Sequence, residues 1–471
     1  MLAVASGAAL PGMIFDPTVN STVPALWFSH QLLDHNNVDH PTYWHQRYFV
    51  NDYYSGNTSR PTTVFLYLYG ELPAVGGWLN APNSHMVQLA KSHKALLVGL
   101  EHRFYGESQP TGNWNRTSLE YLTSTQALGD VRTFQDHIAQ TFNMCDSAKW
   151  IAFGGSYAGF LAAAARYTFP DSIHGAVASS ALTHFQPAYP GYATVVSEAM
   201  AQVGGHACVQ VLAQGLRELD ALVRDPAKAA DLQRLVQPCT PSSLMAPWTD
   251  LDRSVVESSV FIKFELIAQM HDVLPYNLTG TCADLTKPGN ATALARVLGI
   301  RGPLFSATTN CTPSSYTKWL QGYSDPSVHP MASVNTRPFV WQLCNEFGLA
   351  QVTPDSHSAF ASLGFITQHN IYDQVCLDLF GMTDSADRIA TTNDRYRDLV
   401  STVEHVVFTS GSLDPWKGLC PTVQTAVEPT SMVVYVQGVS HCGDMFALPN
   451  ESKHLARAHK RITDAVHSFL E

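Results

Sequence analysis

The segment FGGSYAG, residues 153–159, follows the mainly apolar run KWIA, residues 149–152, and precedes FLAAAARYTF, which is rich in strong helix formers. A serine on a tight turn between a strand and a helix has a strained backbone, so its neighbours must be small to avoid collisions. Gly154, Ala158 and Gly159 are small enough. The pattern therefore predicts that Ser156 projects its hydroxyl from a sheet edge as a nucleophile. Since it departs from the strict G-x-S-x-G, a glycine-rich packing turn with an inert serine is the alternative.

Short apolar runs elsewhere in the chain have the length of strands. They are continuous rather than alternating, which is typical of strands buried on both faces of a parallel sheet. The segment 118–142 has the spacing of a helix, with Ser118 as its expected cap. This alternation predicts an α/β fold whose strands lie in residues 64–70, 95–101, 149–155, 174–181, 405–411 and 431–438.

A catalytic serine needs a histidine to accept its proton and a carboxylate to orient that histidine. In α/β-hydrolases the acid and then the histidine follow the serine, each on a loop after a late strand. Asp414 follows the run at 405–411, and His441 follows the run at 431–438. They are therefore the candidate acid and base.

Each of these candidates has a simpler reading when taken alone. Asp414 precedes a proline and could form a turn, and His441 is one of 20 histidines. Asp444 is a rival acid, but it follows the histidine and has no strand end of its own, which favours a structural role.

Acyl transfer also requires hydrogen-bond donors where negative charge develops. The expected donors of this oxyanion hole are the backbone N–H of Tyr157 and one from the loop after the run at 64–70, at Gly70. An ordinary turn at the end of that strand is the alternative for Gly70.

Between about residues 185 and 334 the chain changes character, with helical tracts and few strand-like runs. No long linker separates this part, so we expect it to pack on the sheet as a cap. The predicted architecture is an α/β-hydrolase fold with an inserted helical cap domain. Residues 1–185 and 335–471 form the hydrolase domain and residues 186–334 the cap.

Composition excludes several classes of protein. Only 14% of the 471 residues are charged, against a norm of about 25%, and 45% are hydrophobic, which suits a large buried core. The net charge of −11, without a basic block, disfavours nucleic acid and anionic membrane surfaces as partners. No apolar run reaches the roughly 18 residues of a membrane span.

No metal or cofactor is expected. His35, His40 and His45 are spaced wrongly for an H-E-x-x-H zinc site and lack a nearby glutamate base. The glycine-rich phosphate-binding motifs of nucleotide-binding proteins are also missing from the sequence.

Sequons and cysteines point to the secretory pathway. The nine cysteines include no C-x-x-C pair and suit disulfides in an oxidising compartment, with nine buried cytosolic thiols as the alternative. The apolar start, residues 1–15, lacks a basic region and is open to reading as a trimmed signal peptide, a native start or a cloning remnant. Asn-x-Ser/Thr sequons occur seven times, at Asn20, Asn57, Asn115, Asn277, Asn290, Asn310 and Asn450.

Motifs along nearly the whole chain resemble the serine carboxypeptidase-like prolyl peptidases, a family that includes lysosomal Pro-X carboxypeptidase, dipeptidyl peptidase II and thymus-specific serine protease. QLCNEFG, residues 342–348, is most similar to the thymus-specific branch. The turn at 68–72 has fewer glycines than is usual in the family, which leaves the second oxyanion donor open. The matching segments are residues 27–28, 33–35, 46–51, 101–108, 154–159, 411–416 and 440–442.

The resemblance implies Ser156 as nucleophile, Asp414 as acid, His441 as base, and cleavage of peptide substrates on the carboxyl side of proline. It also implies an exopeptidase of the lysosome, vacuole or extracellular space, and makes a homodimer reasonable. A proline pocket needs flat apolar walls, for which Phe160 and Trp416 are candidates; packing in the core is their alternative role.

By analogy with the family, the arginine and acidic residues of the segment 102–108 form a structural network and have no catalytic role. The expected disulfides join Cys344 to Cys376 and pair four cysteines within the cap, Cys208, Cys239, Cys282 and Cys311.

Two other functions compete with this one. An esterase or lipase would use the same fold and triad, and a catalytically inactive binding module would retain only the fold. The sequence also leaves carboxypeptidase, dipeptidyl peptidase and endopeptidase action open. That choice depends on whether the cap presents a cation, an anion or an open cleft to the substrate.

Overall fold

The computed structural model describes residues 23–56, 60–239, 248–272, 277–300, 311–329, 337–354, 356–447 and 451–471. The apolar start, the sequons at Asn20, Asn57, Asn310 and Asn450, and the expected end of the cap at residue 334 lie outside these residues.

One mixed sheet forms the centre of the larger lobe, with the strand order β1-β2-β4-β3-β5-β6-β9-β10. β1 and β2 are antiparallel to each other, β2 is antiparallel to β4, and all pairs from β4 to β10 are parallel. The strands are β1 (Ala25–Leu32), β2 (Tyr43–Asn51), β3 (Thr63–Leu68), β4 (Leu96–Leu100), β5 (Lys149–Gly155), β6 (Gly175–Ser179), β9 (Val406–Gly411) and β10 (Met432–Val436).

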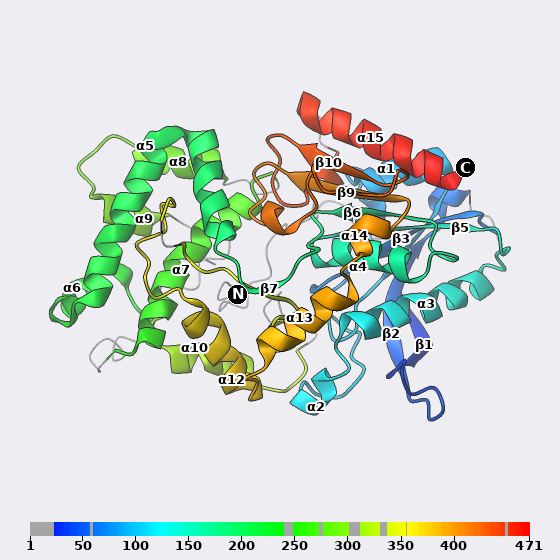
Figure 1. Cartoon of the computed structure of the whole chain (residues 1–471), viewed down its shortest axis with the longest axis horizontal. Coiled ribbons are helices and arrows are strands. Elements are labelled where there is room, and N and C mark those ends of the chain that lie inside the picture. Colours follow the sequence, from blue (N-terminus) through cyan, green and yellow to red (C-terminus); the bar gives the residue numbers. More distant parts are fainter. Residues whose placement is uncertain are drawn as a thin grey trace.

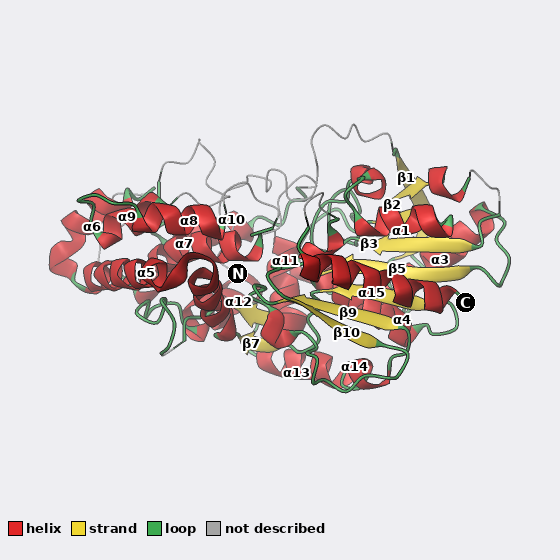
Figure 2. Ribbon diagram, turned by 90° about the horizontal axis from the view of Figure 1, so that it is seen from above, coloured by secondary structure: helices red, strands yellow, loops and turns green. Residues whose placement is uncertain are grey.

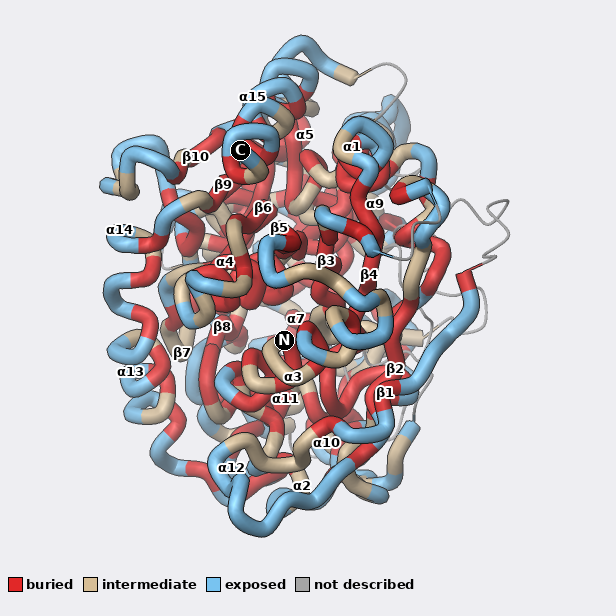
Figure 3. Tube along the Cα trace, turned by 90° about the vertical axis from the view of Figure 1, so that its right-hand side faces the viewer, coloured by how far each residue is buried: buried red, intermediate tan, exposed pale blue. Residues whose placement is uncertain are grey.

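Helices cover both faces of this sheet (Figure 2). On one face, α1 (His85–His93) and α15 (Lys453–Leu470) pack on a core that includes Phe65 and Ile151. On the other, α3 (Ser124–Thr141) and α4 (Tyr157–Thr168) pack on a core that includes Val64 and Leu66. Side chains of a strand alternate between faces, so β3 contributes to both cores. Burial on both faces explains the continuous apolar runs (Figure 3). The mostly parallel sheet with helices on both faces confirms the predicted α/β-hydrolase fold.

The start of α3 differs from the sequence prediction. The helix begins at Ser124, and the side chain of Thr123, not Ser118, accepts the capping hydrogen bond, from the Gln126 backbone N–H. The Ser118 hydroxyl instead donates to Asn113 Oδ1. Both residues are good caps, and the local sequence alone did not distinguish them.

Helices dominate the second lobe, on the left of Figure 1. A parallel pair of short strands joins the chain segments that precede and follow this lobe in the sequence. These strands are β7 (Gln186–Ala188) and β8 (Gly348–Ala350). The positions at which the cap begins and ends stay predictions. The helices of this lobe are α5 (Gly191–Arg224), α6 (Ala229–Val236), α7 (Asp250–Gln269), α8 (Leu278–Thr286), α9 (Ala293–Gly299) and α10 (Tyr316–Ser324).

Short helices complete the described chain. They are α2 (Arg116–Leu119), α11 (Arg337–Gln342), α12 (Gln374–Phe380), α13 (Ser385–Arg395) and α14 (Leu399–Thr402), with single turns of 3-10 or π type at η1 (Tyr53–Ser55), η2 (Gly76–Asn80), η3 (Pro226–Lys228), η5 (Leu343–Phe347), η6 (His369–Asp373), η7 (Lys417–Leu419) and η8 (Gly443–Met445).

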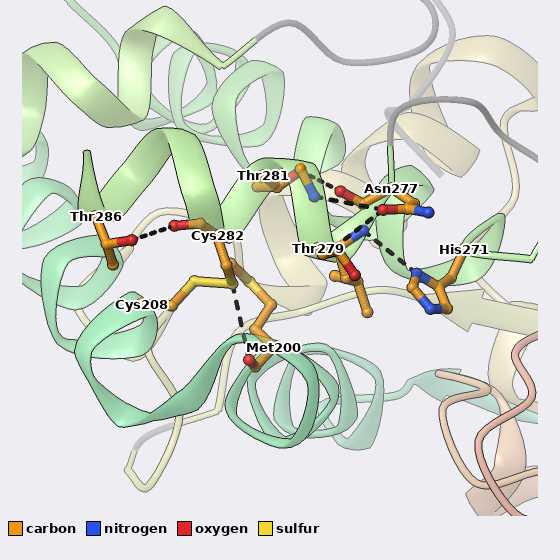
Figure 4. The surroundings of a disulfide bond; sticks show 10 residues. Met200, Cys208, His271, Asn277, Thr279, Thr281, Cys282 and Thr286 are labelled. Atoms are coloured by element: carbon orange, nitrogen blue, oxygen red, sulfur yellow. Dashed lines mark hydrogen bonds between the residues drawn. A yellow bond between two sulfur atoms is a disulfide. The ribbon is translucent and has the colours of Figure 1, made fainter.

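Disulfides pair the cysteines as the family resemblance implies. Cys208–Cys282 joins α5 to α8 (Figure 4), and the other two are Cys239–Cys311 and Cys344–Cys376. Near the first, the side chain of Asn277 accepts hydrogen bonds from the Thr279 and Gly280 N–H groups and so caps α8. The cysteines without a disulfide partner in the described chain are Cys145, Cys420 and Cys442.

No helix among the described residues is both long and apolar enough to span a membrane. Nor do three or more histidine, cysteine, aspartate or glutamate side chains gather there as a group that could hold a metal ion.

Candidate active site

Ser156 occupies the turn between β5 and α4, with φ 58° and ψ −127°. This left-handed backbone is costly for a residue with a side chain and persists only where packing enforces it. A Cβ added at Gly154 would lie 2.1 Å from the Ala158 carbonyl oxygen, and one added at Gly159 would lie 2.6 Å from the Ser179 carbonyl oxygen. The small residues around the serine are therefore required by the close approach of β5, α4 and β6.

The candidate acid and base are in direct contact. His441 Nδ1 lies 2.9 Å from Asp414 Oδ1, and the Asp414 side chain is completely buried. The same oxygen accepts the Trp416 backbone N–H at 2.9 Å. His441 Nε2, the other ring nitrogen, has no hydrogen-bond partner among the described residues. It is the nitrogen on which a general base would accept a proton.

The charge state of His441 follows from this contact. Burial lowers the pKa of the imidazole, but Asp414 and then Cys442 outweigh burial and hold the His441 pKa well above its usual value. A carboxylate in this position stabilises the imidazolium that forms when a serine is deprotonated.

Ser156 and His441 line one cavity of about 150 Å³. Its lining is mainly apolar, and its polar side chains include Glu71 and Gln269. The aromatic and sulfur-containing residues around it are Tyr67, Tyr69, Trp78, Met270, Met445, Phe446 and Cys442.

The two residues proposed from the sequence as pocket walls do not line this cavity. Phe160 is 1% exposed, and its ring packs 4.9 Å from Tyr396 and 5.2 Å from Phe185, between ring centroids. The Trp416 Nε1–H donates to Gln269 Oε1 at 3.1 Å, so Trp416 supports a residue of the wall. A pocket role for either stays a prediction.

The aromatic residues that do line the cavity were not predicted from the sequence. Tyr67 and Tyr69 alternate in the run VFLYLYG and therefore point to the same face of β3 and its continuation. That alternation was the available signal, but it does not distinguish a cavity wall from a core.

Gly70, one expected oxyanion donor, lies against the start of α4. A Cβ added there would be 3.4 Å from Ala158 Cβ and 3.6 Å from the Ala158 backbone nitrogen. Tyr157, the other, is the first residue of α4. The first N–H groups of a helix have no partner within it and are free to bind an anion.

The phenol of Tyr157 points into a buried chain of hydrogen bonds. Burial lowers the pKa of His102 to about 4, so this ring is neutral; its Nδ1–H donates to the Arg103 carbonyl at 2.7 Å. His102 Nε2 then accepts the Tyr157 hydroxyl proton at 2.9 Å, and Gln342 Nε2 donates to the Tyr157 oxygen at 3.0 Å. The Tyr105 hydroxyl donates to Gln342 Oε1. This chain fixes the residue that follows the nucleophile.

The segment 102–108, expected to form a structural network, makes buried hydrogen bonds, several of them to Glu101, the residue before it. Glu101 accepts hydrogen bonds from Arg47 Nε at 3.0 Å and from the Ser108 hydroxyl at 2.7 Å. Arg103 Nε donates to Asp130 Oδ2 at 2.6 Å. These buried pairs tie β2 and α3 to the end of β4.

Asp444, the rival acid, has a different partner. Its Oδ1 accepts the Ser179 hydroxyl at 2.6 Å, and burial raises the pKa of its carboxyl. It therefore joins the His441 loop to β6, which agrees with a structural role.

Comparison with known proteins places the chain in a family. The model for serine carboxypeptidase S28 matches residues 31–462. Thymus-specific serine protease of Mus musculus is 29% identical over 461 residues, covering 95% of this chain and 88% of that protein. Lysosomal Pro-X carboxypeptidase of Homo sapiens is 25% identical over 417 residues, covering 85% and 79%.

Among solved structures, a bacterial heroin esterase is similar over 98% of this chain and 88% of its own, at 12% identity and a TM-score of 0.36. The sequence relatives confirm the resemblance described above, and the thymus-specific protease matches this chain at higher identity and coverage than the Pro-X carboxypeptidase does. Because the family match covers most of the chain, this protein is a member of the serine carboxypeptidase S28 family.

Proposed function

We propose that this serine hydrolase cleaves peptides on the carboxyl side of proline, with Ser156 as nucleophile, His441 as general base and Asp414 as the acid. The observation that carries the proposal is the apolar cavity shared by Ser156 and His441, beside the His441–Asp414 hydrogen bond. A name of one relative, lysosomal Pro-X carboxypeptidase, points to the same substrate class.

In the proposed mechanism, His441 Nε2 removes the hydroxyl proton of Ser156 while Oγ attacks the carbonyl carbon of the proline residue. The backbone N–H groups of Tyr157 and Gly70 stabilise the resulting oxyanion. His441 returns the proton to the leaving amine, the C–N bond breaks and an acyl-enzyme remains. Water, deprotonated by His441, then releases the peptide acid and free Ser156.

The cavity suits a proline ring because its wall is aromatic and rigid. Tyr67 and Trp78 pack with ring centroids 5.4 Å apart, and Trp78 also packs against Phe446 at 5.6 Å. Burying the three methylenes of the ring supplies about 2.4 kcal/mol of selectivity. Conformational entropy adds little cost, because the proline ring is already fixed.

Charge bears on the position of the cut. Among the described residues that line the cavity, Glu71 has the only carboxyl group, and none is lysine or arginine. Burial raises the pKa of Glu71, and an ammonium group nearby would favour its ionised form. This supports an exopeptidase that recognises the amino terminus of its substrate.

A secretory location fits the same proposal. The three disulfides are typical of oxidising compartments. Two of the described sequon residues, Asn115 and Asn290, are exposed. We place the protein in the lysosome, vacuole or extracellular space; a homodimer stays a prediction.

The test is a peptide mixture with proline at several positions and with free or blocked termini, analysed by mass spectrometry after incubation with wild type, Ser156→Ala and Glu71→Gln. We expect wild type to cut after proline and Ser156→Ala not to cut. Glu71→Gln should raise KM about tenfold for peptides with a free amine, since one ion pair is lost, and leave blocked peptides unchanged.

Several outcomes would contradict the proposal. Cutting by Ser156→Ala would exclude the nucleophile. Hydrolysis of simple acyl esters without cleavage after proline would support the esterase alternative. Equal loss on free and blocked peptides in Glu71→Gln would exclude recognition of the amino terminus.

A further inference from the structure

The last residues of α7 and the turn after it contact the loops that carry both Asp414 and His441. Gln269, which ends α7, accepts hydrogen bonds from Trp416 Nε1 at 3.1 Å and from the Tyr192 hydroxyl at 2.8 Å. The Trp416 backbone N–H in turn donates to Asp414 Oδ1. The loop of the acid is thereby tied to a helix of the second lobe.

Asp272, three residues after Gln269, makes the corresponding contact to the loop of the base. Its Oδ2 accepts the Ser440 N–H at 2.6 Å and the Ser440 hydroxyl at 2.8 Å, while its own N–H donates to Ser440 Oγ at 3.4 Å. Ser440 is 1% exposed and directly precedes His441. These contacts join residues 168 positions apart in the sequence.

The remainder of that loop has little room to move. A Cβ added at Gly443 would lie 2.6 Å from Asp272 Oδ2, and Cys442, at φ 56°, donates its N–H to Ser180 Oγ at 2.9 Å. The residues on either side of His441 are thus held by Asp272 of the helical lobe, at Ser440, and by Ser180, which directly follows β6, at Cys442.

We propose that the C-terminal end of α7, through Asp272 and Gln269, is a positioning element that holds the Asp414 and His441 loops in their reactive arrangement. The inference rests on the proposed function, which assigns Asp414 as the acid and His441 as the base. Asp272 does not line the cavity, so it acts through Ser440 and not on the substrate. Met270, between the two contacts, does line the cavity, which links the substrate wall to the same element.

Loss of Asp272 should affect chemistry more than binding. Without the carboxylate, Ser440 loses two hydrogen bonds, and the His441 loop loses its contact with the helical lobe. A misplacement of about 1 Å in a catalytic group can cost about 100-fold in rate. The apolar wall that binds the substrate is unchanged, so KM should change little.

The experiment compares Asp272→Ala, Asp272→Asn, Ser440→Ala and the double variant Asp272→Ala/Ser440→Ala with wild type, using a small acyl ester and a fluorophosphonate that counts active sites. The control is Asp231→Ala, which removes an exposed carboxylate of α6 that pairs with Arg234. Per active site, Asp272→Ala should lower kcat about 10- to 100-fold at nearly constant KM and slow labelling in parallel.

The conservative variant separates positioning from general stability. Asp272→Asn keeps an oxygen acceptor for both Ser440 hydrogen bonds and should retain most of the activity. The double variant should be no slower than Asp272→Ala, because both changes break the same contact. The control should match wild type.

Wild-type kcat and labelling rate in Asp272→Ala, or additive losses in the double variant, would overturn the inference. Ser156→Ala, measured in the same series, tests the proposed function separately. Continued hydrolysis by that variant would refute the nucleophile, whereas an unchanged Asp272→Ala beside an inactive Ser156→Ala would refute only the positioning role.

Discussion

Single residues with a strained or buried setting define the candidate site. Ser156 has a left-handed backbone, Asp414 is completely buried, and His441 binds Asp414 while its second ring nitrogen has no partner in the described chain. These three residues follow the ends of three different strands, β5, β9 and β10. Of the properties of these three residues, the pKa of His441 is the most easily measured, because it sets the pH dependence of activity.

Activity should fall at acid pH, because a protonated His441 cannot act as a base. Asp414 outweighs burial and raises the pKa of His441, so the acid limb of kcat/KM should lie above pH 6.5. Asp414→Asn removes this charge; the limb should move to lower pH and kcat should fall by about 10⁴-fold. A pH–rate profile of each variant measures both effects.

Asp444→Asn is the matched control for that profile. It removes another buried carboxylate while keeping an acceptor for Ser179, and we expect the acid limb to stay in place. A limb that moves in Asp444→Asn but not in Asp414→Asn would reverse the assignment of the acid.

Elements were predictable from the sequence where burial is uniform. The six continuous apolar runs correspond to the parallel strands β3, β4, β5, β6, β9 and β10, most of whose residues are buried. The antiparallel strands β1 and β2 were missed, since polar residues interrupt both (ALWFSHQL and YWHQRYFVN) and most of β1 is exposed at the sheet edge. The contact of Asp272 with Ser440 and the cavity wall at Tyr67 could not be predicted, because each depends on the packing of elements far apart in sequence.

The elbow between β5 and α4 should not tolerate larger residues. Gly159→Ala would bring a methyl group against the Ser179 carbonyl, and overpacking of this kind costs about 1–3 kcal/mol of unfolding free energy. Gly322→Ala is the control, because that glycine lies within α10 and a Cβ there meets nothing within 4 Å. It should gain about 0.5–1 kcal/mol. Urea unfolding distinguishes the two, and equal effects would contradict this account of the elbow.

At the scale of the whole molecule, buried ionisable groups make stability depend on pH in two directions. Burial raises the pKa of Glu265 to about 8 and that of Glu346 to about 7. These carboxyls stabilise the fold fully below their unfolded pKa near 4.5, and the contribution is lost as pH rises through the folded values. Burial, with His459 beside it, lowers the pKa of His85 to about 3, which has the opposite consequence.

His85, the first residue of α1, packs against His459 of α15, and its contribution to stability should be lost on acidification. Its folded pKa is below the unfolded value of 6.5, so the unfolded chain takes up the proton first as pH falls from 6.5 towards 3. The loss is about 1.4 kcal/mol per pH unit at most. His85→Gln should therefore show a smaller fall in Tm from pH 7 to pH 4 than wild type, in calorimetry.

His454→Gln, which changes an exposed histidine in the first turn of α15, is the comparison for this series. Its Tm should follow the wild-type pH dependence. If His85→Gln also follows wild type, the interface between α1 and α15 does not contribute to the acid sensitivity of the fold.

The thiol of Cys442 affects how inhibitors of this protein should be interpreted. Cys442 lines the cavity next to His441, and a Cβ on Gly155, the residue before the nucleophile, would be 3.0 Å from its sulfur. A maleimide or mercurial attached to this thiol would fill the space in which an acyl group must sit. Inactivation by such reagents would thus resemble that of a cysteine peptidase, although the attacking atom proposed here is an oxygen. Inhibitor class alone is therefore a poor guide to the nucleophile of this enzyme.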